Sequence, residues 1–162
     1  KVAELLDLRS YDLAGNRMAD LVRDVAALAP TYFVSELFGL PLESRANKKG
    51  FYTEHELHVV LSTIATVLFT QVDVVKKFPL LQAVKTLSSQ LATAIEKTVK
   101  SPKSNKSQPL SSYGAKLIKE LTKAGVSRHD ITWAHVLAAS AAVVAYQTKI
   151  EVIVSYHNIR NR

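Results

Sequence analysis

The chain of 162 residues contains no cysteine, and only five glycines, five prolines and one methionine. The lack of cysteine excludes disulfides, thiolate zinc sites, cysteine nucleophiles and a thiolate-ligated haem held by this chain alone. Glycine and proline are too scarce for a collagen-like or low-complexity chain. The length suits one domain, or one piece of a larger domain.

Sequence motifs of the common enzyme classes are also missing. The chain has no G-x-S-x-G elbow and no glycine-rich phosphate loop of either common type. His55 and His58 are three residues apart, whereas zinc hydrolases carry H-E-x-x-H with a spacing of four. We therefore interpret the two histidines as a surface pair. The sequence does not support a self-contained hydrolase, kinase or dehydrogenase.

Positive charge is in excess, with 21 Lys and Arg against 14 Asp and Glu, a formal net charge of +7. Much of the surplus lies in short polar stretches, above all in KTVKSPKSNKSQP at residues 97–109. A run of serine, lysine and proline is typical of a solvated loop, which we favour here over a dedicated anion site.

Apolar residues recur at helical spacing along most of the chain. Asn16 is a candidate cap for a helix over residues 16–28, and Pro30 is expected to end or kink it. A second helix is predicted over residues 31–38. It ends at Gly39, which suits a left-handed C-cap.

Three further signals mark the predicted starts and ends of helices in the middle of the chain. Thr53 and Glu56 form a capping-box pair for a helix reaching about residue 72. Pro79 is expected to open the next helix. A short amphipathic helix over residues 113–123 is closed by Gly125.

The last and longest helix is predicted over residues 128–155, opened by a capping box of Ser127 and Asp130. Its apolar run at residues 131–146 contains His135 and falls short of about 18 clean apolar residues, so we interpret it as a buried helix. EVIVSY at residues 151–156 is rich in β-branched residues, but its attachment to a helical pattern favours helix over strand. The predicted fold class is all-α, with about six helices.

Residues 117–137 also have the layout of a helix-turn-helix motif. The second helix of this segment is apolar nearly all round, whereas a recognition helix needs polar side chains that reach base edges. We therefore expect no binding to nucleic acid.

Small residues fill the middle of the longest helix, from residue 137 to residue 145. They allow another helix, or a flat cofactor, to approach the backbone closely. Because a fully apolar helix is usually a buried one, close packing against a helix is the favoured interpretation.

The segments DLVRDVAALAP at residues 20–30 and ELFGLP at residues 36–41 resemble a cytochrome P450 segment. The longer run RSYDLAGNRMADLVRDVAALAPTYFVSELFGLPL, followed by YTEHEL, is similar to the P450-like domain of the fungal psi-producing oxygenases, also called linoleate diol synthases. In that family a dioxygenase domain makes a fatty-acid hydroperoxide, and the P450-like domain isomerises it, usually to a diol.

This resemblance implies a partial P450-like fold over residues 1–162, from the helices before the lid through the long central helix. Residues 132–156 then correspond to the central helix that crosses the haem face. The implied haem-facing residues are Ala141, Ala142, Ala145 and Tyr146. The implied contacts to a hydroperoxide or fatty carboxylate are Gln147 and Lys149.

The chain departs from the family pattern in three ways. The loop with the proximal cysteine ligand is absent, and so is the E-x-x-R motif. The family's A-N-x-x-Q motif corresponds to residues 145–149, where Tyr146 and Lys149 replace both amides and Gln147 stands at another position. The resemblance thus implies haem in the intact parent protein, but neither tight haem binding nor catalysis by this chain alone.

A fragment of this kind leaves helix faces uncovered, so we expect self-association through exposed apolar surfaces. The expected ligand is a fatty acid or its hydroperoxide. An alternative from another class is a small helical module that binds a lipid chain or a partner helix. The N-terminal KVAELLDLRS lacks both an initiator methionine and the layout of a signal peptide, and we expect an intracellular, cytoplasmic location.

Overall fold

The computed structural model describes residues 2–40, 42–43, 48, 50–70, 73–102 and 109–160. Within them the chain is almost entirely helical, as predicted. The elements are α1 (Val2–Arg9), β1 (Tyr11–Leu13), β2 (Asn16–Met18), the π-helical segment η1 (Leu21–Ala26), α2 (Leu28–Phe38), α3 (Glu54–Phe69), α4 (Val74–Lys100), α5 (Pro109–Lys123), α6 (Arg128–Asp130), the π-helical segment η2 (Ile131–Leu137) and α7 (Ala138–Arg160).

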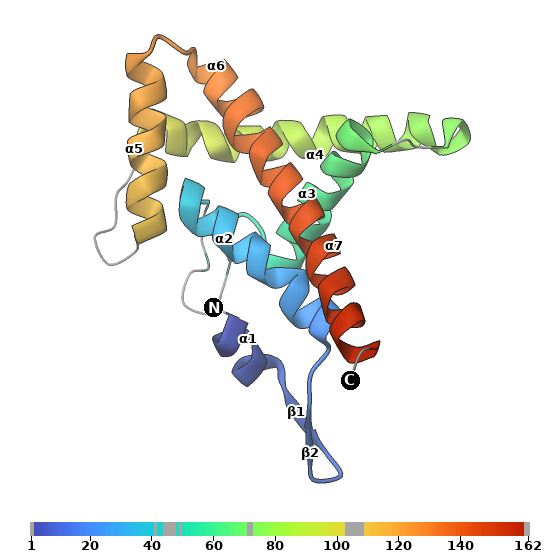
Figure 1. Ribbon diagram of the computed structural model, residues 1–162. Coiled ribbons are helices and arrows are strands. Elements are labelled where there is room, and N and C mark those ends of the chain that lie inside the picture. The colour runs from blue at the N-terminus through green and yellow to red at the C-terminus, as the bar shows by residue number, and fades with distance from the viewer. Residues whose placement is uncertain are drawn as a thin grey trace.

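The long rod formed by α6, η2 and α7 organises the molecule (Figure 1). It crosses α4 near one end and packs against α3 and α2 further along. α5 lies against α2, while the β1–β2 hairpin projects away from the helices. The N-terminal part of α4 extends beyond its neighbours (Figure 1).

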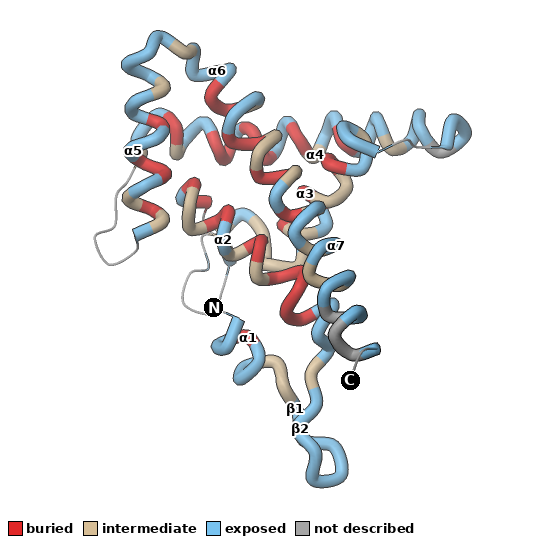
Figure 2. The backbone as a smooth tube through the Cα atoms, in the orientation of Figure 1, coloured by how far each residue is buried: buried red, intermediate tan, exposed pale blue. Residues whose placement is uncertain are grey.

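The hydrophobic core lies where α2, α3, α4 and the long rod meet, and buried residues concentrate there (Figure 2). Leu61 of α3, Ile95 of α4, and Ile131 and Val144 of the rod are fully buried. Away from this centre, the N-terminal end of α4 and the C-terminal half of α7 are mostly exposed or half-buried (Figure 2). One core therefore holds four helices together and leaves their outer ends uncovered.

The prediction that a helix starts at Asn16 is wrong. Strands β1 and β2 form an antiparallel hairpin there, turning through Ala14 and Gly15, both of which have positive φ, at 52° and 79°. Two positive φ values are the geometry that suits the right-handed twist of a two-residue hairpin loop. The helix begins only after Asp20, whose side chain accepts a hydrogen bond from the Arg23 amide at 2.9 Å.

Pro30 does not end a helix, because it lies in the first turn of α2. Proline is tolerated at this position, since first-turn N–H groups have no partner within their own helix. The predicted second helix therefore starts earlier than residue 31, at Leu28. It ends as predicted at Gly39, which has a φ of 64°.

Pro79 does not open a helix either, since it lies inside α4. The N-cap is Asp73, which accepts a hydrogen bond from the Val75 amide at 3.0 Å. Proline cannot donate to the carbonyl four residues earlier, here that of Val75. Because Val75 is 84% exposed, water can satisfy this carbonyl, and the helix continues.

The predicted capping box at Thr53 is confirmed. At Ser127 only the N-cap bond is present, because the Asp130 carboxylate accepts from the Ser127 hydroxyl and not from its backbone amide. Thr53 and Glu56 exchange side-chain and backbone hydrogen bonds at the start of α3, and Ser127 accepts from the Asp130 amide at 3.1 Å. α3 ends at Phe69, and residues 71–72, where its predicted end fell, lie outside the described residues. α5 ends before Gly125, as predicted, but begins at Pro109, four residues early. Of the predicted serine- and lysine-rich loop, residues 103–108 lie outside the described residues.

The rod continues as helix through EVIVSY, so the helical interpretation of residues 151–156 is confirmed. By length and composition alone, Arg128–Val154 is apolar enough to cross a membrane. Core helices of globular proteins share this property. The rod buries Ile131, Val136, Ala141 and Val144 in the core, but only 28% of its most apolar stretch is buried, so the prediction of a buried helix holds in part.

Candidate functional site

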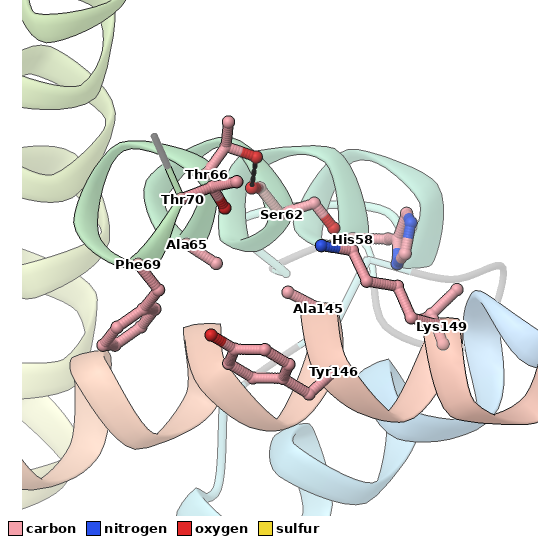
Figure 3. Close-up of a pocket in the computed structure, with 10 residues that line it drawn as sticks. His58, Ser62, Ala65, Thr66, Phe69, Thr70, Ala145, Tyr146 and Lys149 are labelled. Atoms are coloured by element: carbon pink, nitrogen blue, oxygen red, sulfur yellow. Dashed lines mark hydrogen bonds between the residues drawn. The ribbon is translucent and has the colours of Figure 1, made fainter. Parts of the chain in front are cut away.

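A pocket of about 140 Å³ lies between α3 and the middle of α7 (Figure 3). We call it the His58 pocket. It is lined by His58, Ser62, Ala65, Thr66, Phe69 and Thr70 from α3 and its end, and by Ala145, Tyr146, Thr148 and Lys149 from α7.

Helical spacing explains why these side chains meet. On α3, His58, Ser62 and Thr66 are four residues apart, and residues at this spacing share one face of a helix. On α7, Ala145 and Lys149 have the same spacing, with Tyr146 beside them. The pocket is thus the seam between two facing helical stripes, and its lining mixes polar side chains with a larger apolar surface.

His58 is the most unusual group of the pocket. Burial lowers its pKa, and the charge of His55 lowers it further, while a hydrogen bond to the backbone carbonyl of Ala27 opposes the shift. Atom Nδ1 is buried and has no hydrogen-bond partner within the described part of the chain. The imidazole is therefore neutral at neutral pH and holds a buried nitrogen with an unmet hydrogen-bonding capacity.

Lys149 contributes the pocket's positive charge. Its Nζ atom lies 5.8 Å from the centre of the Tyr146 ring, within the range of a cation–π contact. Among the described residues, no carboxylate forms an ion pair with this ammonium group. In Figure 3 the side chain reaches across the pocket toward Ser62 and His58. A negatively charged or hydrogen-bond-accepting ligand would be attracted to this position.

The implied site residues do not all lie together. Ala145, Tyr146 and Lys149 line the His58 pocket, whereas Ala141 is fully buried in the core and Ala142 is half-buried. Gln147 lies on another face of α7, where it lines a separate groove of about 310 Å³ with residues of α2. Its amide donates to the Glu151 carboxylate at 3.1 Å. Gln147 and Lys149 therefore line different cavities.

The sequence interpretation missed His58, which is half-buried and not part of a surface pair. One available signal was its position three residues before Leu61 and seven before Ala65, next to the apolar stripe of α3. A histidine bordering a buried stripe is well placed to bond with a backbone carbonyl of a neighbouring helix. That the neighbour is Ala27 follows only from the packing of α2 on α3.

The residues of this chain do not by themselves fit a haem. The sequence offers no cysteine thiolate, and the described residues contain no cluster of three or more histidine or acidic side chains. His58, whose Nδ1 atom is buried without a partner among the described residues, lines a pocket of about 140 Å³, well below the roughly 300–1,000 Å³ of typical ligand pockets. Any axial ligand would have to come from elsewhere.

Comparison with known proteins gives a consistent set of relatives. The chain is 36% identical over 159 residues to a bifunctional dioxygenase–epoxy alcohol synthase of Fusarium oxysporum. The alignment covers 91% of this chain and 12% of that protein. It is 34% identical over 158 residues to psi-producing oxygenase A of Emericella nidulans, covering 91% of this chain and 15% of that protein. A linoleate diol synthase of Gaeumannomyces graminis is 37% identical over 81 residues, covering 50% of this chain and 7% of that protein.

No family model and no solved structure matches the chain. The chain spans 12% and 15% of the first two relatives named above, so it corresponds to a small part of each. Identity of 33–37% over nine-tenths of this chain recurs among relatives with several different names. The chain is therefore a homologue of one segment of the fungal psi-producing oxygenases and dioxygenase–epoxy alcohol synthases.

Proposed function

We propose that this chain is the part of a P450-like domain that covers the fatty-acyl substrate in an oxylipin-forming oxygenase. The observation that supports the proposal most is the similarity over 91% of the chain to proteins named for fatty-acid oxygenation. The cytochrome P450 motifs at residues 20–41 give it further support. The activity of the complete protein would be isomerisation of a fatty-acid hydroperoxide or oxidation of a fatty acid.

Within that activity, the residues of this chain bind and orient the substrate. Ala65, Phe69 and Ala145 form an apolar side of the His58 pocket and reduce water around the ligand. Lys149 and His58 supply the polar side. Because the chain provides no thiolate, haem chemistry would depend on the rest of the longer protein, and this chain alone is not catalytic.

The alternative of a small lipid- or partner-binding module has its own supporting observation. A groove of about 310 Å³ runs beside Phe33 of α2 and Val143 of α7. A groove of about 390 Å³ adjoins it through their shared residues Gln147 and Glu151, and is otherwise mostly apolar. Grooves of this size suit an acyl chain or an apolar helix face.

A chimeric oxygenase tests the leading proposal. In the Fusarium oxysporum relative, the segment aligned with this chain is replaced by the 162 residues of this chain. Linoleic acid is then supplied, and the dioxygenase product and the epoxy alcohol are measured separately by mass spectrometry. Dioxygenase activity reports whether the chimera is folded. A second chimera carries Tyr146→Asn, which restores the first of the family's two amides and leaves Lys149 in place.

We expect both chimeras to retain haem in the P450-like part, as measured by the Soret absorbance. We also expect the amide-restoring variant to form at least about tenfold more epoxy alcohol relative to the dioxygenase product, a difference of about 1.4 kcal/mol in the barrier. A chimera with full dioxygenase activity but no haem in the P450-like part, and no epoxy alcohol from either version, would refute the proposal. Saturable micromolar binding of linoleate by the isolated monomeric chain would then favour the binding module.

A further inference from the structure

Two groups on opposite walls of the His58 pocket have no partner among the described residues: the ammonium of the exposed Lys149 and a buried ring nitrogen of His58. On α7, the Lys149 ammonium has no carboxylate partner among the described residues. On α3, Nδ1 of His58 is buried without a hydrogen-bond partner. A buried polar atom without a partner costs free energy, so a ligand that satisfies it gains affinity. The two walls together favour one ligand group that can interact with both.

The size of the pocket limits that ligand group. A volume of about 140 Å³ corresponds to roughly five water molecules at about 30 Å³ each. The pocket therefore admits one polar end group and a few carbons, but not a whole long-chain fatty acid. Hydroxyls of Ser62, Thr66 and Tyr146 add to its polar lining. A methyl end would gain nothing from Lys149 or His58, so the polar end is the part that fits.

We propose that the His58 pocket binds the carboxylate end of a fatty acid, with Lys149 donating to one oxygen and a protonated His58 donating to the other. That the ligand has a long acyl chain rests on the proposed function. That its carboxylate enters the pocket rests on the residues of the pocket itself. The acyl chain would leave along Phe69, which is 47% exposed at the end of α3.

Proton uptake by His58 is part of the proposal. The free imidazole is neutral at pH 7 because burial lowers its pKa. A bound carboxylate favours the imidazolium, while the positive charges of Lys149 and His55 oppose it. Tyr146 also lines the pocket from α7, where its phenol can donate and accept a hydrogen bond. Binding should therefore take up a fraction of a proton per ligand near pH 7, and affinity should fall as pH rises.

Calorimetric titration of the chain with octanoate tests these statements, with methyl octanoate as the uncharged control. Lys149→Met removes the charge but keeps most of the stem. Lys119→Met is the matched control, on an exposed lysine of α5. His58→Gln keeps a donor and an acceptor but cannot titrate. Titrations in two buffers with different heats of ionisation report the proton uptake.

We expect saturable octanoate binding that Lys149→Met weakens about tenfold or more, and that Lys119→Met changes less than about twofold. Methyl octanoate should bind about tenfold more weakly than octanoate. Proton uptake should disappear in His58→Gln. Equal affinity for acid and ester, or binding that Lys149→Met leaves unchanged, would overturn the assignment.

The same variants in the chimeric oxygenase separate this inference from the proposed function, and they also serve if the isolated chain aggregates. Dioxygenase activity again reports folding. If epoxy alcohol forms but the KM for its precursor is the same in Lys149→Met and Lys119→Met, the carboxylate site is wrong and the proposed function stands. If no epoxy alcohol forms in a folded, amide-restored chimera, the proposed function fails. Octanoate binding to the chain then still decides the carboxylate site.

Discussion

The Thr148 hydroxyl on α7 donates to the backbone carbonyl of Ala26 at 3.2 Å, across 122 residues of sequence. In a regular helix this carbonyl would accept from the amide four residues later, but that residue is Pro30, which has no N–H. The hydroxyl has a single proton, which it shares between this carbonyl and the carbonyl of Val144 in its own helix, 2.7 Å away. The Thr148 hydroxyl therefore supplies a donor to the Ala26 carbonyl, which Pro30 leaves without an amide partner.

This contact fixes the rotation of α7 beside the His58 pocket. Thr148 lines the pocket between Ala145 and Lys149, and its bond to Ala26 holds this stretch of α7 against the start of α2. His58 bonds to the next carbonyl, that of Ala27, from α3. The irregular backbone before Pro30 is thus a junction where α3 and α7 are both attached, and it positions the two walls of the pocket.

The first prediction concerns Thr148→Val, which keeps the shape of the side chain and removes the donor. We expect it to lower the free energy of unfolding by about 1–3 kcal/mol, because the Ala26 carbonyl loses its side-chain donor. Urea denaturation measures the change. Thr122→Val is the matched control, since the Thr122 hydroxyl bonds only within its own helix, to the Ile118 carbonyl at 2.8 Å. Equal losses for the two variants would contradict the role given to Thr148.

The sequence predicted those parts of the fold that depend on local patterns. Gly39 and Gly125 ended their helices as predicted, and Thr53 and Ser127 capped theirs, because a cap is decided by the residues within one turn. Pro30 and Pro79 were interpreted wrongly for a related reason. Whether a proline interrupts a helix depends on what satisfies the carbonyl it leaves, and a partner such as Thr148 lies far away in the sequence.

The pocket could be predicted only on its α7 side. The resemblance implied that Ala145 and Tyr146 face haem and that Lys149 contacts the substrate. The three side chains line one pocket, and those roles stay predictions. Gln147 was grouped with Lys149 because they are close in sequence, yet two residues along a helix is a rotation of about 200° and leads to another face. His58 could not be assigned, because its burial depends on how α2 and α3 pack together.

The second prediction concerns acid stability and Asp24, a buried carboxylate of η1 that is 4% exposed. A hydrogen bond and ion pair with Arg23, at 2.9 Å, hold the pKa of Asp24 below its ordinary value despite burial. A carboxyl with a lowered pKa stabilises the fold above its unfolded pKa of about 3.9, and that stability is lost as pH falls through the folded pKa.

We therefore expect Asp24→Asn to reduce stability at pH 7 and to flatten the loss of stability below about pH 4. Arg23→Gln should reduce stability less than Asp24→Asn, because the Arg23 side chain is 68% exposed and solvent screens the pair. Thermal unfolding between pH 2.5 and pH 7 measures both. An acid limb unchanged by Asp24→Asn would show that this carboxyl does not contribute to acid unfolding.

The third prediction concerns Gly114, in the middle of α5. A Cβ atom at this position would collide with the backbone carbonyl of Leu37, so glycine is what allows α5 to lie directly against α2. We expect Gly114→Ala to destabilise the fold by about 1–3 kcal/mol, since backbone cannot move aside as a flexible side chain does. Gly125→Ala is the control, because Gly125 has a φ of 83° but open space around it.

The two glycine variants differ in what they disturb, and hydrogen exchange separates them. Gly114→Ala should increase amide exchange in both α5 and α2, because it forces the helices apart. Gly125→Ala should cost about 1 kcal/mol of backbone strain and affect mainly the turn after α5. Unchanged exchange in α2 in the Gly114→Ala variant would show that the two helices do not depend on this contact.

The last prediction concerns self-association through the projecting N-terminal end of α4. Val74 and Val75 are each 84% exposed there, and Phe78 is 70% exposed. No acidic residue occurs between Asp73 and Glu96 to keep this stretch solvated. Adjacent exposed apolar side chains favour association, since burying them against another copy removes them from water.

We expect the chain to sediment as oligomers, and the combination of Val75→Lys with Phe78→Glu to shift it toward monomer. Leu8→Lys, at a residue of α1 that is 72% exposed, should not produce this shift, and if it does so equally, association is not specific to α4.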